Sequence, residues 1–247
     1  MESLKSESVS KRFGSLYAVQ NVSLSIGSGE RRAIIGPNGA GKTTLLNLFT
    51  GQLKPSAGRI YMFGQDVTAI PEHQRVHLGL ARTFQVMNLI FNLSVLDNVL
   101  LAIQAVMPFR FGMFRSQNAY SNLSEEAQML LTQWGLWERR KDLVRNLSYG
   151  EQRRMELATA LASKPNILLL DEPTSGLSEA EAASFVAMIR GLGRDTTLVI
   201  VEHDMDVVFE MADYITVLHY GQVIVEGTKE EIKANSKVRE VYLGEEG

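Results

Sequence analysis

A glycine-rich octapeptide carries the clearest chemistry in this chain. Residues 36–43, Gly-Pro-Asn-Gly-Ala-Gly-Lys-Thr, fit the pattern G-x-x-x-x-G-K-[ST] at every fixed position. Such glycines let the backbone curl so that its N–H groups point at phosphate oxygens, and the following helix adds the positive end of its dipole. Lys42 would reach the β- and γ-phosphates, and Thr43 would offer a hydroxyl to Mg²⁺. The expected phosphate contacts are Gly36, Pro37, Asn38, Gly39, Ala40, Gly41, Lys42, Thr43 and Thr44.

Two carboxylates follow an aliphatic run much later in the chain. Residues 167–170 predict a buried strand, and Asp171 and Glu172 stand at its C-terminal end, where ligands bind in open α/β sheets. Asp171 is placed to hold Mg²⁺, through water, and Glu172 is placed to polarise the attacking water or accept its proton. The alternative is that both acids cap a helix after Pro173.

The elements that must position these groups alternate between strands and helices. Short apolar or β-branched runs predict strands at 19–26, 32–35, 59–63, 167–170 and 197–201, and a hairpin formed by 215–218 and 222–225. Helical spacing predicts helices at 42–50, 152–162, 180–192 and 206–212. This alternation predicts an α/β fold with a mostly parallel sheet covered on both faces.

The middle of the chain has a different character. From about Val86 to Asn146 the strand signals fade and Leu, Met, Ala and Glu recur at helical spacing, as in 125–134. We expect a single domain over 1–247, with 86–150 as a helical subdomain inside the α/β core. Residues 107–122 are rich in Phe, Arg, Gly, Ser and Asn and predict an irregular segment.

Composition excludes several classes of function. The chain has no cysteine among its 247 residues, so disulfides, thiol catalysis and zinc–thiolate sites are excluded. A net charge of −3 gives no basic footprint for nucleic acid. The polar start, 1–11, does not resemble a signal peptide, and no apolar run reaches the roughly 18–20 residues of a membrane helix. We therefore expect a soluble, cytoplasmic protein that attaches to a membrane through a partner.

Further motifs resemble those of one family. Residues 147–151, Leu-Ser-Tyr-Gly-Glu, resemble the signature motif, commonly LSGGQ, of ATP-binding-cassette (ABC) ATPases. Phe13 stands where this family places an aromatic residue that stacks on adenine. Gln85, in Arg-Thr-Phe-Gln, matches the Q-loop glutamine, and His203, in Glu-His-Asp, matches the switch histidine. The alternatives without a functional role are that Phe13 is a core residue, Gln85 a loop amide and His203 a structural histidine.

The resemblance implies a fold and a mechanism. The fold would be a P-loop NTPase core with an N-terminal antiparallel β portion and an inserted α-helical subdomain. Two domains would close face to face around two ATP molecules, and the signature residues Ser148, Gly150 and Gln152 would contact the nucleotide held by the other subunit. Glu172, His203 and Gln85 would be catalytic, and Thr43, Gln85 and Asp171 would hold Mg²⁺.

Two positions depart from the family pattern. Tyr149 replaces the usual first glycine of the signature, which leaves Ser148 and Gly150 usable provided that this position needs no positive φ. Ser178 stands where many relatives carry the aspartate of the D-loop, residues 175–178. Because Ser178 begins Ser-Glu-Ala-Glu, it is also a candidate helix cap.

The exact residues in several motifs indicate which branch of the ABC family the chain resembles. The Arg-Thr-Phe-Gln and Glu-His-Asp-Met segments and the ending Val-Tyr-Leu-Gly, 241–244, resemble ATPases of branched-chain (hydrophobic) amino-acid importers. Alternatives are a urea or amide importer, a lipopolysaccharide exporter, a non-transport soluble ABC ATPase, and an unrelated phosphate-loop kinase or GTPase.

The resemblance to importers implies transmembrane permease subunits, a second ATPase subunit in a homo- or heterodimer, and, indirectly, an extracytoplasmic binding protein. It places the chain peripherally at the cytoplasmic face of the membrane. Residues suggested for the permease groove are Met87, Leu89, Ile90, Phe91 and Leu93, with the lobe core as the alternative.

Overall fold

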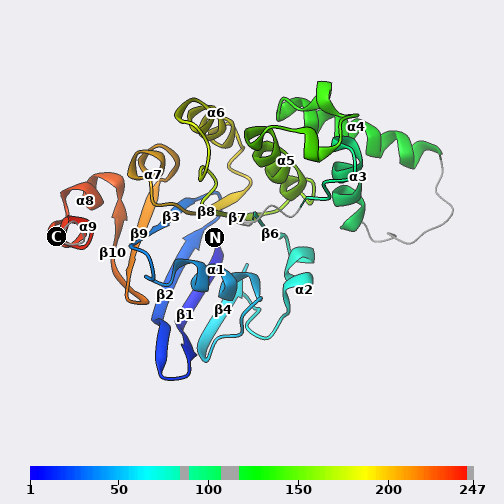
Figure 1. The fold of residues 1–247 in the computed structure, drawn as a ribbon. Helices are drawn as coiled ribbons and strands as arrows, with labels where there is room; N and C mark the ends of the chain where they lie inside the picture. Colours follow the sequence, from blue (N-terminus) through cyan, green and yellow to red (C-terminus); the bar gives the residue numbers. More distant parts are fainter. Residues whose placement is uncertain (84–88, 107–116, 244–247) are drawn as a thin grey trace.

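Two β-sheets organise the computed structural model, which describes residues 1–83, 89–106 and 117–243 (Figure 1). The smaller sheet is antiparallel, with strand order β2-β1-β4-β5. This arrangement confirms the expected N-terminal antiparallel portion. Its strands are β1 (Glu2–Phe13), β2 (Leu16–Gly27), β4 (Ala57–Met62) and β5 (Gln65–Asp66).

The larger sheet has the order β10-β9-β3-β8-β7-β6. Neighbouring strands run parallel except for the β9–β10 hairpin, so the expected mostly parallel sheet is confirmed. Strands β3, β7 and β8 are buried along their whole length, which explains why β7 and β8 are near-continuous apolar runs in the sequence. The strands are β3 (Arg31–Ile35), β6 (Leu80–Arg82), β7 (Ile167–Asp171), β8 (Thr197–Val201), β9 (Tyr214–His219) and β10 (Gln222–Thr228).

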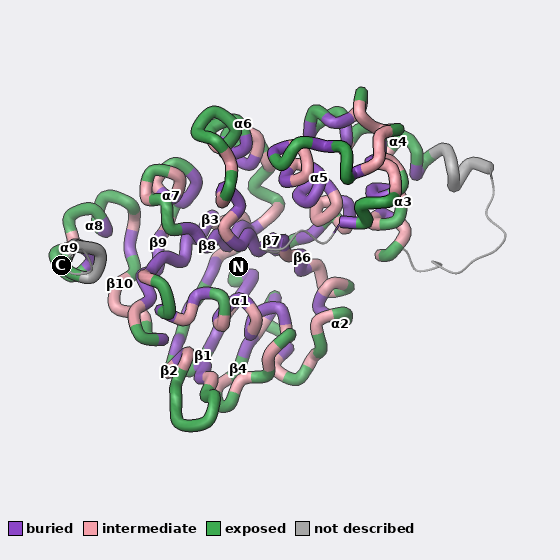
Figure 2. The backbone as a smooth tube through the Cα atoms, in the orientation of Figure 1, coloured by how far each residue is buried: buried purple, intermediate pink, exposed green. Residues whose placement is uncertain are grey.

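Helices cover both faces of the larger sheet. Successive residues of β7 point to opposite faces, so Leu169 shares a core cluster with Leu45 of α1, whereas Leu168 shares one with Phe185 of α6. Figure 2 shows buried strands between helices whose outer turns are exposed. None of the described helices is long and apolar enough to cross a membrane. The covering helices are α1 (Lys42–Thr50), α2 (Glu72–His77), α6 (Glu179–Arg190), α7 (Met205–Met211), α8 (Lys229–Ala234) and α9 (Ser236–Leu243).

Helical elements fill the described chain between β6 and β7, to the right in Figure 1. Helix α3 buries Val95, Val99 and Ile103 at four-residue intervals, which is the stripe expected of a helix with one apolar face. The expected irregular segment 107–122 is wrong over 117–122, because α4 begins at Gln117; residues 107–116 lie outside the described chain. The elements are α3 (Val95–Ala105), α4 (Gln117–Gln133), the 3₁₀ turns η1 (Trp137–Arg139) and η2 (Val144–Asn146), and α5 (Tyr149–Leu161).

A buried arginine fastens the end of α1. Arg75 of α2 is only 1% exposed, and its guanidinium donates to the carbonyls of Leu48 at 2.9 Å, Phe49 at 2.6 Å and Val67 at 2.7 Å. Burial lowers the pKa of Arg75 to about 10. The positive charge lies at the C-terminal end of the helix, where the helix dipole favours a cation.

Replacing Arg75 by alanine should lower the free energy of unfolding by roughly 3 kcal/mol, because buried carbonyls lose their donors. Arg75→Lys should recover only part of this loss, since an ammonium has three donors and cannot reproduce the planar fork. Urea unfolding of the two variants and the parent protein measures the effect. Equal midpoints for all three would show that this clamp contributes nothing.

Candidate functional site

A hollow of about 280 Å³ lies between the glycine-rich loop and the carboxyl end of β7. It forms where the carboxyl ends of β3 and β7 reach the same edge of the sheet. The structure therefore brings Glu172 together with the predicted phosphate loop. The lining residues are Ala18, Asn38, Gly39, Ala40, Gly41, Lys42, Thr43, Thr44 and Glu172.

Two glycines of the loop sit where no other residue fits. Gly36 has φ 151°, and a Cβ there would lie 2.1 Å from the Leu218 carbonyl oxygen. Gly41 has φ 102°, and a Cβ there would lie 2.3 Å from the Ala18 carbonyl oxygen. The loop is thus pressed against β2 and the end of β9. Such close backbone approach explains why the pattern requires glycine.

The loop presents positive charge to the hollow. The Lys42 ammonium donates to the carbonyls of Gly36 at 2.6 Å and Pro37 at 3.0 Å, so it lies within the curve of the loop. Helix α1 follows, and no described side chain caps its start. Its first N–H groups and its dipole therefore favour an anion where Gly41, Thr43 and Thr44 line the hollow.

Asp171 ends β7 and is 1% exposed. Its Oδ2 accepts from Arg82 Nη2 at 2.7 Å, whereas its Oδ1 is buried and has no hydrogen-bond partner among the described residues. A buried carboxylate oxygen without a donor suits a cation or a water bound to one. No group of three or more His, Cys, Asp or Glu able to hold a metal occurs in the described residues, so a magnesium site here would also need hydroxyl and phosphate oxygens.

Glu172 lines the hollow in a left-handed backbone conformation. Its φ is 48°, which is uncommon for a residue with a Cβ. Its N–H donates to the Val201 carbonyl at 2.8 Å. The alternative that the two acids cap a helix after Pro173 is wrong, because the next helix, α6, begins at Glu179 and is capped by Ser178. The Ser178 capping box with Glu181 is itself confirmed.

His203, the predicted switch histidine, lies just beyond β8. The His203 side chain is 64% exposed, so it is not a packed core histidine. It follows the fully buried Glu202, whose carboxylate accepts from the His203 N–H at 3.0 Å. Sequence reasoning assigned no role to Glu202 or to Arg82. Their signal was weak, because each is one charged residue inside a longer motif.

The signature segment forms the start of α5, away from the residues that line the hollow. Ser148 caps this helix and forms a capping box with Glu151. Gly150 is buried, and a Cβ there would lie 2.7 Å from a Glu181 carboxylate oxygen. The Gln152 amide nitrogen donates to the Leu147 carbonyl at 3.0 Å. The prediction for these three residues concerns a nucleotide on another subunit, so it stays a prediction.

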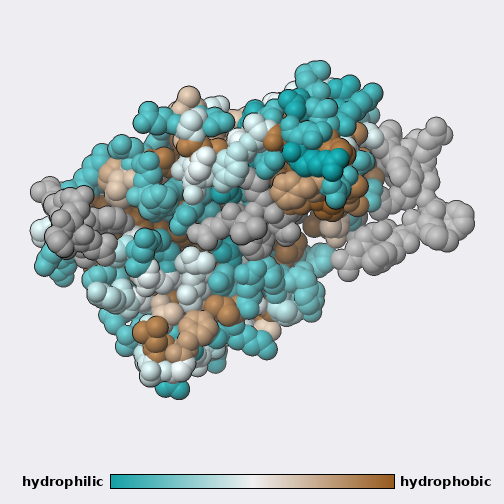
Figure 3. All heavy atoms as spheres, viewed as in Figure 1, coloured by the Kyte–Doolittle hydropathy of each residue, from teal (hydrophilic) through white to brown (hydrophobic). Residues whose placement is uncertain are grey.

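Phe13 lies at the end of the β1–β2 hairpin and is 49% exposed, so it does not belong to the core. Figure 3 shows apolar side chains gathered at this hairpin end.

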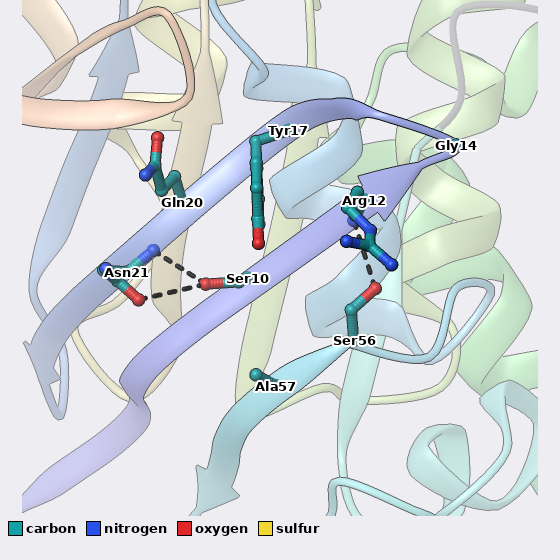
Figure 4. A pocket seen from close by; sticks show the side chains of 8 residues that line it. All are labelled: Ser10, Arg12, Gly14, Tyr17, Gln20, Asn21, Ser56 and Ala57. Carbon is teal, nitrogen blue, oxygen red and sulfur yellow. Dashed lines mark hydrogen bonds between the residues drawn. The ribbon is translucent and has the colours of Figure 1, made fainter.

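A second hollow, of about 470 Å³, lies beside the same strands (Figure 4). Its lining is largely polar and includes Arg12, Tyr17, Gln20 and Asn21 but no residue of the glycine-rich loop.

Comparison with known proteins identifies the family. The sequence profile of the ABC transporter family matches residues 19–175. The chain belongs to the ABC transporter ATP-binding family. A second profile, described as branched-chain amino acid ATP-binding cassette transporter, matches residues 222–247. The branched-chain amino acid transport ATP-binding protein LivG of Salmonella typhimurium is 38% identical over 243 residues, covering 95% of this chain and 94% of its own.

Solved structures agree with this assignment. A crystal structure of an ATP-binding cassette of an ABC transporter in its ADP conformation has a TM-score of 0.86 and 31% identity, and the match covers 99% of each chain. A dimeric cassette in a post-hydrolysis state, bound to ADP and Pi, has a TM-score of 0.77 and 29% identity, covering 91% of this chain and 98% of its own. The chain is thus an ABC ATPase of the branched-chain amino acid transporter subfamily.

The tyrosine in the ABC signature is accommodated without strain. Tyr149 is the first residue of α5 and is not among the positive-φ residues of the described chain, so its position does not require glycine. Its hydroxyl donates to the Ser175 carbonyl at 3.1 Å, and its ring lies about 3 Å from where a Cβ on Gly176 would be. The signature and the D-loop of this ABC ATPase are therefore in direct contact within one chain.

The predicted permease groove is divided between core and surface. Leu89 is buried in the core of the helical elements, so its assignment to the groove is wrong. Ile90 and Phe91 are exposed, and Asn98 fixes them by accepting from the Ile90 N–H at 2.9 Å and donating to the Ile90 carbonyl at 3.1 Å. Leu93 is half-buried, whereas Met87 and the predicted ligand Gln85 lie outside the described residues.

Replacing Arg82 by methionine should lower the ATPase kcat and destabilise the protein by about 3 kcal/mol, because the buried Asp171 would lose its charged partner. Asp171→Asn in the same background should restore part of the stability but not the activity. Thermal unfolding and a phosphate-release assay on the parent protein and the two variants test this. Unchanged stability in Arg82→Met would show that Asp171 does not depend on this arginine.

Proposed function

We propose that this chain hydrolyses ATP to power an ABC importer for branched-chain or other hydrophobic amino acids. The observation that carries the hydrolysis is the shared hollow, in which Lys42, Thr43 and Glu172 meet. The cargo is supported by the match over residues 222–247 and by the similarity to LivG.

In the proposed reaction, ATP is bound mainly through its phosphates. The N–H groups of the loop and of the first turn of α1 hold the phosphate oxygens, and Lys42 neutralises part of their charge. Glu172 accepts the proton of the attacking water, and His203 contacts the γ-phosphate side of the site. Thr43, Asp171 and Gln85 would hold Mg²⁺, which, when bound, offsets the charge that develops on the phosphates. The Asp171 Oδ1, which has no hydrogen-bond partner in the part of the chain that the structure describes, supports this choice of ligand.

The active unit would be a dimer of cassettes. Ser148 and the N–H of Gly150 stand at the start of α5, where the helix dipole favours an anion. This placement supports contact with the γ-phosphate held by the phosphate loop of a second subunit, with Gln152 beside it. The dimeric neighbour bound to ADP and Pi supports a dimer of cassettes. Hydrolysis removes the bridging charge and lets the dimer open.

The remaining partners would sit at the cytoplasmic face of the membrane. The chain is proposed to be one domain over 1–247, whose helical lobe, 86–150, and the exposed Ile90 and Phe91 receive permease subunits. A second ATPase subunit would complete the dimer, and an extracytoplasmic binding protein would select the cargo. The ATPase itself would not contact the cargo.

Isolation of the complex tests this proposal. Tagged Glu172→Gln protein, held with ATP, is isolated from gently solubilised native membranes, and its companions are identified by mass spectrometry. Two permease subunits of the amino-acid type, with or without a second ABC ATPase, are expected. Lys42→Ala is the matched control, because it should not be held closed by ATP. Ribosomal or DNA-repair partners, or permeases of a urea or lipopolysaccharide system, would contradict the proposed transport role.

A further inference from the structure

Glu202 is a fully buried carboxylate at the end of β8. It is 0% exposed and accepts three hydrogen bonds from two segments of the chain. Its Oε1 accepts from the Thr174 N–H at 3.0 Å and from the Thr174 hydroxyl at 2.5 Å. Its Oε2 accepts from the His203 N–H at 3.0 Å. Both oxygens are therefore used, one by each segment.

No arginine or lysine of the described chain forms an ion pair with Glu202. Among the described residues, the basic group that approaches Glu202 within 4 Å is the His203 imidazole, whose Nδ1 lies 3.6 Å from Oε2. Burying a carboxylate is costly unless hydrogen bonds compensate for the lost water. A carboxylate accepts at both ends, whereas an amide has one acceptor end and one donor end and cannot serve both segments. The use of a carboxylate here thus indicates a requirement for holding both segments firmly.

The two segments that Glu202 joins are those that carry the proposed chemistry. Thr174 comes two residues after Glu172, which is held at a φ of 48°. The Glu172 N–H donates to the carbonyl of Val201, the residue before Glu202. A strained backbone persists only where its surroundings over-determine it. The hydrogen bonds from Thr174 to Glu202 and from Glu172 to Val201 supply that restraint.

We propose that Glu202 is a positioning residue that locks the base Glu172 and the switch histidine His203 into one unit. One carboxylate oxygen fixes the turn after Glu172, and the other fixes the backbone of His203. Displacement of either side chain is then transmitted to the other. This inference rests on the proposed function, because it takes Glu172 as base and His203 as switch.

Glu202→Gln tests whether the hydrogen bonds of Glu202 hold the Glu172 and His203 segments together, with little change in side-chain volume. An amide has one acceptor and one donor end, so its NH₂ must face either the His203 N–H or the Thr174 N–H. One segment is then released. In the isolated transporter complex, kcat should fall about 10–100-fold, as for small misplacements of catalytic groups, while KM for ATP stays within about twofold. The phosphate loop holds the nucleotide and is untouched.

A second pair of variants separates positioning from stability. Thr174→Val deletes the hydroxyl bond and should lower kcat about tenfold, since one of three bonds is lost. Thr174→Ser keeps the hydroxyl and should restore kcat. The matched control is Thr216→Val, because the Thr216 hydroxyl also donates to a glutamate, Glu226, at 2.8 Å, but in the β9–β10 hairpin. It should lose at least as much stability and keep kcat, because its hydroxyl also accepts from Arg32 Nη1 at 3.0 Å.

Hydrogen exchange gives a direct readout of the coupling. Thr174→Val should speed exchange of amides 203–207, although Thr174 lies 28 positions before Glu202 in the chain. If Thr174→Val and Glu202→Gln both keep wild-type kcat, or lower it only as much as Thr216→Val does, the inference is overturned. If Glu202→Gln does not fold, the Thr174→Val and Thr174→Ser pair decides the question. Glu172→Gln in the same assay separates the two failures, because wild-type turnover in that variant would overturn the proposed function itself.

Discussion

Replacing Glu172 by glutamine should lower the kcat for ATP hydrolysis by about 10²–10⁴-fold, the usual contribution of a general base. Glutamine has nearly the same shape as glutamate but cannot accept the proton of the attacking water. ATP affinity should remain within about threefold, because loop N–H groups and Lys42 hold the phosphates. Single-turnover hydrolysis and equilibrium ATP binding measure the two quantities separately.

A glutamate far from the hollow is the control for this substitution. Glu138 lies on the surface of the helical elements with its side chain 90% exposed. Glu138→Gln should therefore hydrolyse ATP at the parent rate. Near-normal turnover in Glu172→Gln would remove the assignment of Glu172 as base, and an equal loss in both variants would point to a general effect of charge.

Replacing Lys42 by alanine should weaken ATP binding about 10–100-fold, which corresponds to the loss of charge-assisted hydrogen bonds of roughly 1.5–3 kcal/mol. The ammonium also donates to Gly36 and Pro37, so the loop loses an internal support. Hydrolysis should fall with binding. Titration with a fluorescent ATP analogue gives the dissociation constant.

Lys164→Ala is the control for the loss of a lysine. Lys164 is 75% exposed and pairs with Glu126 on the surface of the helical elements, away from the hollow. Its removal should leave nucleotide affinity unchanged. The same affinity for Lys42→Ala and the parent protein would mean that the loop does not bind phosphate through this side chain.

The phosphate loop and the acidic pair Asp171 and Glu172 could be predicted because the residues that carry their chemistry are adjacent in the sequence. Gly36 and Gly41 are specified by close backbone contacts, and the strand before Asp171 is an unbroken apolar run. Strand β1 had no such signal. Its buried positions include Ser3, Ser6 and Ser10 alongside Leu4 and Val9, and its register shifts repeatedly, so no alternation of apolar residues is visible.

Arg82 and Glu202 were not predicted as site residues, because their partners lie in distant segments of the chain. Arg82 reaches Asp171 across 89 positions of the chain, and Glu202 reaches Thr174 across 28. The residues next to Arg82 and Glu202 in the sequence predict only that each is a charged side chain at the surface. The start of α4 was missed for a related reason, because Asn118, Ser121 and Asn122 have modest helix propensity. The helix is stabilised further on by Leu123, which packs into the core.

Transport of radiolabelled leucine across a membrane shows whether ATP hydrolysis by this chain drives amino-acid import. The complex isolated with this chain is reconstituted in proteoliposomes with the ATPase face exposed and the binding protein enclosed, and ATP is added outside. Enclosed leucine should leave the lumen, which is the import direction, with the parent chain, and should stay in the lumen with Glu172→Gln or Lys42→Ala. Leucine movement that persists in both variants, or ATP hydrolysis that moves no hydrophobic amino acid, would contradict the proposed import.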